Sequence, residues 1–134
     1  MAVDGCGAPL FGLSLTGLAR AVQGLVLATP GSAPRQVADA MRAHPELIRG
    51  PQAPDTLLMQ SLEGWYAKGG AEGLICAASS DGLAVSLKVE DGHPRALRPA
   101  LGAFLGTLGL DGSIFGSTPL RNSRDELVGE VQAS

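Results

Sequence analysis

Apolar residues recur at helical spacing in the first part of the chain. One face of a helix would carry Leu15, Leu18, Val22 and Leu25. Ser14 or Thr16 stands at the expected N-cap, where a side-chain oxygen accepts a hydrogen bond from a free backbone N–H. Gly17 and Gly24 each cost about 1 kcal/mol relative to alanine inside such a helix, so packing of the apolar face must offset them.

Two shorter helices are predicted to follow. Pro34 favours the first turn of one, in which Val37 and Met41 share a face. This helix is expected to stop at 44–45, where a histidine precedes a proline. Asp55 is expected to begin a third helix that runs to residue 59, with its carboxylate accepting from the free N–H groups. Three helical segments are therefore expected before any strand.

From residue 64 onward the pattern changes to short runs that are typical of strands. These runs cover 65–68, 73–79 and 83–89. Asp81 and Gly82 lie between the last two, and Asp-Gly favours a two-residue type I′ turn in which both central residues have positive φ. The second half of the chain is thus predicted to contain an antiparallel sheet.

A last helix is predicted from a stripe made of Leu97, Leu101, Phe104, Leu105 and Leu108. Pro99 lies inside the stripe, so we expect a kinked helix or one that starts at Pro99. Residues 126–131 are expected to add one more strand. Helices followed by antiparallel strands and a closing helix indicate an α+β fold, in one domain covering 1–134.

Composition and charge exclude several kinds of partner. Hydrophobic residues make up 45% of the 134 and charged residues 17%, which is typical of a folded domain. The formal net charge is -3 and the ten Lys and Arg are scattered, so no nucleic-acid partner is expected. The longest apolar stretch, at 18–28, is too short and too interrupted for a membrane span. With no membrane partner and no leader pattern, the expected location is cytoplasmic.

The segment AKGGAEG, residues 67–73, is the first candidate for chemistry. Lys68 ends a predicted strand and is followed by Gly69 and Gly70, so a substrate can lie against bare backbone while the ammonium supplies charge. Lys-small-Gly strands of this kind border the active site of penicillin-recognising serine enzymes. The alternative is a solvated lysine followed by a β-bulge at the two glycines.

The two cysteines are expected to be free thiols, because two cysteines do not make a disulfide framework. Cys6 is a candidate metal ligand or nucleophile, and the alternative is a small buried thiol in a glycine turn. No other Cys or His lies at ligand spacing from it. His44 is expected to end a helix, and His93 is expected to occupy a turn.

A self-sufficient hydrolase would also need an activated nucleophile. No serine has a lysine three residues later, and Ser86 is followed by Lys88 at the wrong spacing although both share one strand face. The G-x-S-x-G elbow is absent. The sequence does not exclude a Ser-His-Asp triad, although neither histidine stands in a context that suggests a catalytic role. The chain alone does not look like a complete enzyme.

Six segments in this order resemble the asparaginase II family, the bacterial amidohydrolases typified by the inducible rhizobial L-asparaginase. They are DGCGAPLFGLSLTGLARA (4–21), VADAMRAHPELIRG (37–50), DTLLM (55–59), AKGGAEG (67–73), LKVEDG (87–92) and NSRDELVGEV (122–131). The resemblance runs from about residue 4 to 131 and covers only the C-terminal portion of such proteins. It implies a fold like that of serine β-lactamases and glutaminases, with the antiparallel sheet flanked by helices.

The resemblance also implies roles for individual residues. Lys68 matches the strand lysine that borders the catalytic serine, and Gly69 and Gly70 lie against the substrate. Cys6 matches a thiol of a metal site or substrate pocket, which makes zinc a possible cofactor with a single candidate ligand here. Asp4 matches the acid beside that thiol and is expected to orient the substrate loop.

The implied reaction is hydrolysis of L-asparagine to L-aspartate and ammonia through an acyl-serine. The family's N-terminal part carries the S-x-x-K nucleophile and an S-G-K-H segment, and neither occurs here. We therefore expect the chain to be inactive alone and to need the missing N-terminal half or a complementing chain. Residues 50–56 also depart from the family pattern. A homodimer is implied, and the alternative function is a non-catalytic remnant or self-association module.

Overall fold

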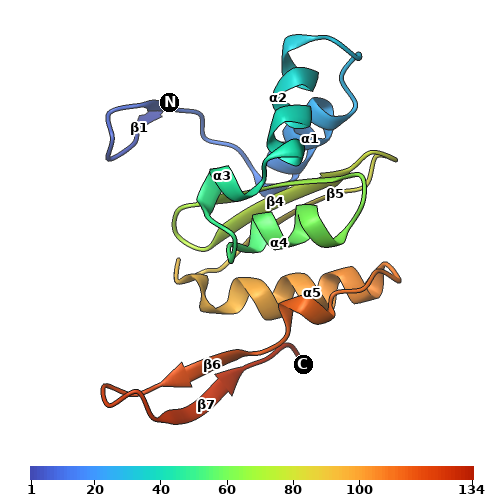
Figure 1. Ribbon diagram of the computed structural model, residues 1–134. Helices are drawn as coiled ribbons and strands as arrows, with labels where there is room; N and C mark the ends of the chain where they lie inside the picture. Colours follow the sequence, from blue (N-terminus) through green and yellow to red (C-terminus); the bar gives the residue numbers. More distant parts are fainter.

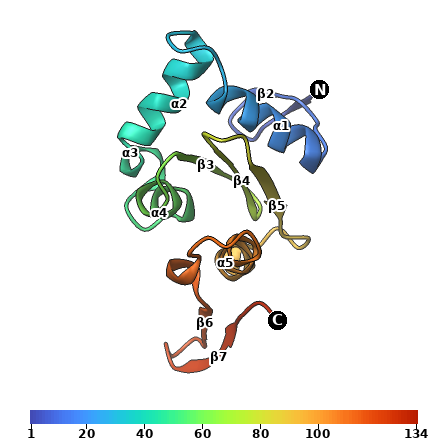
Figure 2. The same ribbon diagram turned by 90° about the vertical axis from the view of Figure 1, so that its right-hand side faces the viewer.

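A three-stranded antiparallel sheet forms the centre of the computed structural model, which describes all residues from 1 to 134. Its strands are β3 (Trp65–Gly70), β4 (Leu74–Ser79) and β5 (Ala84–Lys88), in the order β3-β4-β5. Helices cover both faces of this sheet, as Figures 1 and 2 show. The predicted α+β fold and antiparallel sheet are confirmed.

The first two helices pack on one face of the sheet. α1 (Leu15–Val26) begins where the apolar spacing predicts, and the Ser14 hydroxyl accepts from the N–H of Gly17 at 3.1 Å. α2 (Ala33–Ala43) follows. Val37 was expected to share the packed face with Met41, but it is 51% exposed, and Ala38 is the buried residue of α2. The bulkier side chain is therefore left in solvent.

The other face is covered by α4 (Pro54–Ser61) and α5 (Leu97–Thr107), as Figure 2 shows. α5 is preceded by a 3-10 turn, η1 (Pro94–Ala96), and followed by another, η2 (Ser113–Phe115). The helix begins two residues before Pro99, because a proline in the first turn removes no intrahelical hydrogen bond. A further short helix, α3 (Glu46–Arg49), was not predicted, because four residues show no periodicity.

The turn between β4 and β5 differs from the prediction. Gly82 has φ +97°, whereas Asp81 is not among the residues with positive φ, so the turn is not type I′. The N–H of Gly82 donates to the carbonyl of Ser79 at 3.1 Å, and the Ser79 hydroxyl accepts from the N–H of Leu83 at 3.1 Å. The serine side chain replaces a ladder bond and permits a longer loop.

Two small hairpins lie outside the central sheet. β1 (Ala2–Val3) pairs with β2 (Pro9–Leu10), which corrects the expectation that no strand precedes the helices. β6 (Thr118–Arg121) pairs with β7 (Leu127–Val131), the strand expected at 126–131. Figures 1 and 2 show the β6–β7 hairpin beyond α5, apart from the sheet. No helix is long and apolar enough to cross a membrane.

Candidate functional site

Lys68, Gly69 and Gly70 form the end of β3, which is an edge strand of the sheet. Pairing with β4 continues to Gly70 opposite Leu74 without interruption, so the β-bulge considered at the two glycines is wrong. Lys68 is half-buried rather than fully solvated, and its Nζ donates to the carbonyl of Gly69. The ammonium is thus held beside the bare backbone of the two glycines.

Asp55 fixes this strand end. Its side chain is completely buried, and its Oδ2 accepts from the N–H of Gly69 at 2.8 Å. The sequence predicted a capping role for this carboxylate, but α4 begins at Pro54 after the N-cap Ala53, which makes no side-chain cap bond. A buried carboxylate requires partners, and the backbone of β3 supplies one that is far away in sequence.

Arg49 supplies the charge that faces Asp55. Its Nη1 lies 3.7 Å from Oδ2 of Asp55, while 38% of the arginine side chain remains exposed. A Cβ on Gly69 would lie 1.6 Å from this Nη1 and 3.2 Å from the same Oδ2. Only glycine therefore lets Arg49 and Asp55 approach β3 this closely. We call Arg49, Asp55 and Gly69 the β3 clamp.

Thr56 fixes the segment that carries Arg49. Its Oγ1 is within hydrogen-bond distance of the carbonyl of Gly50 at 2.8 Å and of the carbonyl of Pro45 at 3.0 Å. Because a hydroxyl has one proton, the two carbonyls share it. Consecutive residues of α4 thus hold β3 and the α3 segment, and the packing explains why an Asp-Thr pair opens this helix.

A row of polar side chains crosses the opposite face of the sheet. Lys68 lies opposite Cys76, and Cys76 lies opposite Ser86. The thiol of Cys76 is 3.3 Å from the carbonyl of Lys68, whereas Oγ of Ser86 is buried without a partner. Burial raises the pKa of the Cys76 thiol, an effect that the nearby Lys68 ammonium partly offsets. The thiol therefore stays protonated near neutral pH.

Tyr66 lies on the same face as this row, two residues before Lys68. Burial raises the pKa of its phenol above 10.0, and the thiol of Cys76 and the carboxylate of Asp55 act in the same direction. A neutral phenol and a neutral thiol therefore lie beneath α1. Neither group is prepared to act as a nucleophile at neutral pH.

Asp4 and Cys6 lie in the turn between β1 and β2. The N–H of Gly7 donates to the carbonyl of Asp4 at 2.8 Å, and Oδ1 of Asp4 accepts from the N–H of Gly5 at 2.8 Å. Cys6 is an exposed free thiol whose Sγ is 3.8 Å from Oδ2 of Asp4, so the alternative of a buried thiol is wrong. No hydrogen bond joins this turn to Lys68 or to the β3 clamp.

The metal prediction at Cys6 rests on few donors. No group of three or more His, Cys, Asp or Glu side chains is arranged to hold a metal ion. A structural zinc site requires four ligands, and a catalytic site requires three with one open position. Asp4 and Cys6 together offer two, so these residues do not fit a zinc ion without donors from elsewhere.

No serine hydroxyl lies beside a lysine or histidine that could take its proton. The hydroxyls of Ser32 and Ser61 donate to backbone carbonyls, and those of Ser79 and Ser117 contact the carboxylates of Asp81 and Glu130. The chain therefore shows no serine activated by a lysine or a histidine.

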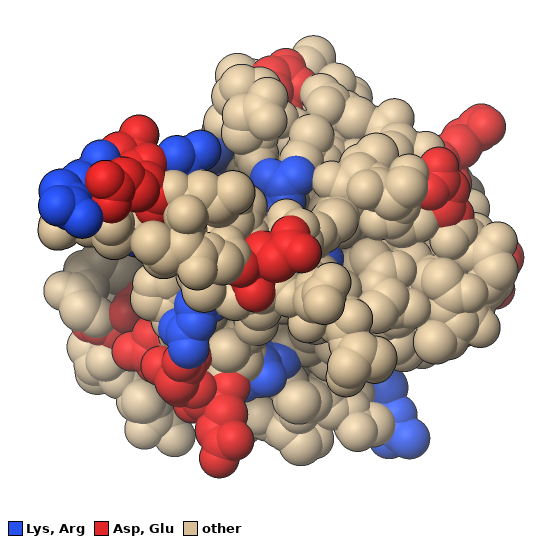
Figure 3. Space-filling model, turned by 90° about the horizontal axis from the view of Figure 1, so that it is seen from below, with Lys and Arg blue, Asp and Glu red and all other residues tan.

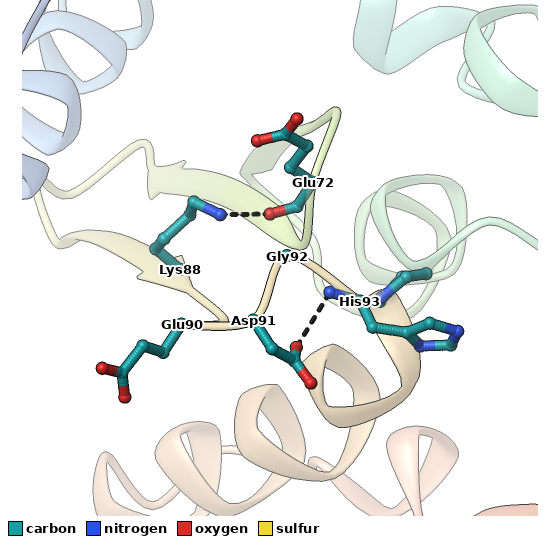
Figure 4. A pocket seen from close by; sticks show the side chains of 7 residues that line it. Glu72, Lys88, Glu90, Asp91, Gly92 and His93 are labelled. Carbon is teal, nitrogen blue, oxygen red and sulfur yellow. Dashed lines mark hydrogen bonds between the residues drawn. The ribbon is translucent and has the colours of Figure 1, made fainter.

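One pocket lies away from these residues, between the β3–β4 turn and the start of η1 (Figure 4). It has a volume of about 440 Å³, and most of its lining residues are charged. Figure 4 shows the carboxylates of Glu72 and Glu90 pointing apart, while Nζ of Lys88 donates to the carbonyl of Glu72. The N–H of His93 and the guanidinium of Arg95 lower the pKa of Asp91. Lys88, Asp91 and Arg95 thus have partners within the protein, and no residue of this pocket belongs to the predicted site.

Comparison with known proteins decides the family. A model of the L-asparaginase II family matches residues 1–133, practically the whole chain. The chain belongs to the L-asparaginase II family. A comparison with curated proteins gave no match. Membership in this family suggests an asparaginase-type amidohydrolase whose substrate is L-asparagine.

The L-asparaginase II chain contains one group of residues that the sequence did not reveal, the β3 clamp. Asp55 lies in the segment 50–56, and Arg49 directly precedes it. The one available signal was an acid in the first turn of a helix that is otherwise apolar on its inner face. An acid at this position is equally compatible with a helix cap. Only the position of Gly69 in the structure shows that Asp55 binds β3 instead of capping α4.

Proposed function

We propose that this L-asparaginase II chain forms the strand wall of an L-asparagine amidohydrolase pocket. Lys68 lies at the reacting centre, and the backbone of Gly69 and Gly70 contacts the substrate. The observation that carries this proposal is the β3 clamp, because a fully buried Asp55 holds the N–H of Gly69 at 2.8 Å. Such support keeps a strand end rigid enough to orient a substrate.

The attacking hydroxyl in this proposal comes from a segment outside these 134 residues. In support, no serine side chain contacts a lysine or histidine, and Ser86 has no partner at all. The implied reaction forms an acyl-serine and releases ammonia, after which water releases L-aspartate. Lys68 is the residue of this chain that can stabilise charge or move a proton beside that serine. A serine β-lactamase-like arrangement of the whole protein remains part of the proposal.

The turn with Asp4 and Cys6 is proposed to face the same pocket. Its support is its exposure, because a free thiol next to a carboxylate is available to groups from another segment or chain. A zinc ion at Cys6 would need at least one further donor of that origin. Zinc analysis after Cys6→Ser, with Cys76→Ser as the control, tests this part, and equal metal content in both variants would contradict it.

The upstream nucleotide sequence and an assay of ammonia release together test the proposal. The nucleotides that precede the Met1 codon are read for an in-frame S-x-x-K and S-G-K-H segment, and the protein that includes it is assayed for ammonia release. We expect Lys68→Met to lower kcat by about 100-fold or more. Lys88→Met is the control, because its Nζ binds the carbonyl of Glu72 on an exposed turn. Stop codons in all upstream frames, or equal kcat in Lys68→Met and Lys88→Met, would contradict the proposal.

A second candidate function is self-association through exposed apolar surface. Phe11 is 77% exposed, Leu127 is 65% exposed and Val128 is 63% exposed. Figure 3, which views the molecule from the side of β6 and β7, shows a largely uncharged face with acidic and basic groups close together. Exposed apolar side chains such as Leu127 and Val128 of β7 gain from burial in an interface. Sedimentation of the chain and of Val128→Lys tests this candidate, which predicts an oligomer that the substitution dissociates.

A further inference from the structure

A second cavity, of about 370 Å³, lies between η1, the start of α5 and β6. We call it the Arg98 cavity. Its basic and polar lining consists of His93, Arg95, Arg98, Thr118 and Arg121. Three prolines and Leu120 complete the wall, and no aspartate or glutamate is part of it. The lining contains none of the residues assigned to the asparagine pocket.

Arg98 gives this cavity a positive charge that the protein does not neutralise. Arg95 pairs with Asp91, and Arg121 faces Asp125 at 3.7 Å, so both are compensated outside the cavity. Arg98 forms no salt bridge, and Nη2 donates only to the carbonyl of Ile114 at 3.0 Å. A guanidinium has five N–H donors, so most of those of Arg98 remain available. A planar guanidinium with free donors matches a carboxylate.

The other polar residues of the lining contribute less than Arg98. Thr118 belongs to the lining, but its Oγ1 is buried, so a ligand in the cavity does not reach this oxygen. His93 adds a donor, because its Nδ1 accepts from the N–H of Arg95 at 3.2 Å and a neutral ring then carries its proton on Nε2.

We propose that the Arg98 cavity binds a small organic carboxylate. The carboxylate accepts hydrogen bonds from the guanidinium of Arg98, and the apolar body of the ligand contacts the prolines and Leu120. The volume is within the range of pockets that hold small molecules. The apolar wall favours a hydrocarbon-bearing carboxylate over an inorganic anion, which gains nothing from contact with proline rings.

Calorimetric titration with benzoate tests the proposal, with inorganic phosphate and neutral benzamide as comparison probes. Benzoate is expected to bind saturably, more tightly than either probe, and more weakly as salt is raised. Arg98→Gln is expected to weaken benzoate by about tenfold or more, since it removes a charged hydrogen-bond donor. Arg124→Gln is the matched control, because Arg124 is 77% exposed and lies outside the cavity.

Leu120→Glu provides a second variant in case Arg98→Gln disturbs the fold through the lost bond to Ile114. Leu120 lines the cavity and is 37% exposed, so the fold is expected to tolerate glutamate there. The added carboxylate repels benzoate, and benzoate affinity is expected to fall severalfold. Absence of saturable benzoate binding overturns the proposal. Equal affinity of Arg98→Gln and Arg124→Gln, unchanged affinity in Leu120→Glu, or phosphate binding as tight as benzoate overturns it as well.

Discussion

Single residues with buried polar groups determine the geometry of the proposed pocket wall. Asp55 is the clearest, since its carboxylate is completely buried and joins α4 to the edge strand β3 through Gly69. Its other oxygen, Oδ1, has no partner within the protein. Keeping such a group buried is costly, and the cost is offset only while Gly69 and Arg49 remain in place.

Asp55→Ala is expected to lower the free energy of unfolding by about 2–3 kcal/mol. The substitution leaves the buried N–H of Gly69 without an acceptor and Arg49 without its carboxylate. Asp39→Ala is the matched control, because the Asp39 side chain is 53% exposed although it also faces an arginine, Arg35. That change is expected to cost about 0.5 kcal/mol or less. Urea unfolding measures both, and equal losses would contradict the assigned role of Asp55.

Cys76 is expected to make the free energy of unfolding fall as the pH becomes alkaline. The thiol has a pKa raised above its usual 9.0 by burial, so the folded state keeps a proton that the unfolded state loses first. Its contribution to stability is therefore complete below about pH 9 and is lost as pH rises through the folded pKa. Tyr66 adds to the same trend above pH 10.

We expect Cys76→Ala to reduce this alkaline slope of the unfolding free energy, whereas Cys6→Ala leaves it unchanged because Cys6 is exposed. Urea unfolding at several pH values between about 8 and 10.5 measures the slope. An unchanged slope in Cys76→Ala would show that the thiol ionises equally in both states.

At the scale of elements, glycines set how closely α5 and η2 pack. A Cβ on Gly112 would lie 2.3 Å from the carbonyl oxygen of Gly102, which is backbone and cannot move aside cheaply. Phe115 of η2 is completely buried in the main core and depends on this approach. Gly106, in the same helix α5, has nothing within 4 Å of its Cβ position.

Gly112→Ala and Gly106→Ala are therefore expected to have opposite effects. The first forces η2 away from α5 and is expected to cost about 2 kcal/mol or more through loosened packing of Phe115. The second is expected to stabilise by about 0.5–1 kcal/mol, since alanine is the better helix former. Thermal unfolding measures both, and a loss of stability in the two variants alike would contradict the packing described.

Elements with long apolar stripes or strand runs were predictable from the sequence, and short ones were not. α1, β4 and β7 follow from spacing, because burial of one face dictates it. α3 has four residues and β6 contains Pro119, so neither carries a periodic signal. The turn at Asp81 and Gly82 was predicted wrongly, because the Ser79 side chain closes a longer loop than the dipeptide alone favours.

The candidate site was predictable only in part for the same reason. Lys68 and the two glycines are adjacent in sequence, but the strand that was predicted to end at Lys68 continues to Gly70. The β3 clamp joins residues that are 14 positions apart, and nothing local indicates that Asp55 turns toward β3 rather than capping α4. The exposure of Cys6 likewise depends on the whole hairpin β1–β2 lying outside the packed layers.

At the scale of the whole molecule, the central sheet is well covered by helices, whereas the two outer hairpins are not. Every residue from Met1 to Thr16 is exposed, as are most residues of β6 and β7. A two-stranded hairpin alone is marginally stable in water, so both hairpins gain from further contacts. The core around the sheet is therefore complete within the chain, whereas the two hairpins are the surfaces that the proposed second segment or second copy would cover.

Ammonia release from L-asparagine by the purified 134-residue chain is the most direct test of the central claim. The account predicts no release above that of a heat-denatured sample, because no serine hydroxyl contacts a lysine or histidine side chain that could take its proton. Steady release over many turnovers, proportional to the amount of chain and free of any companion protein, would contradict the claim that the attacking hydroxyl lies outside it.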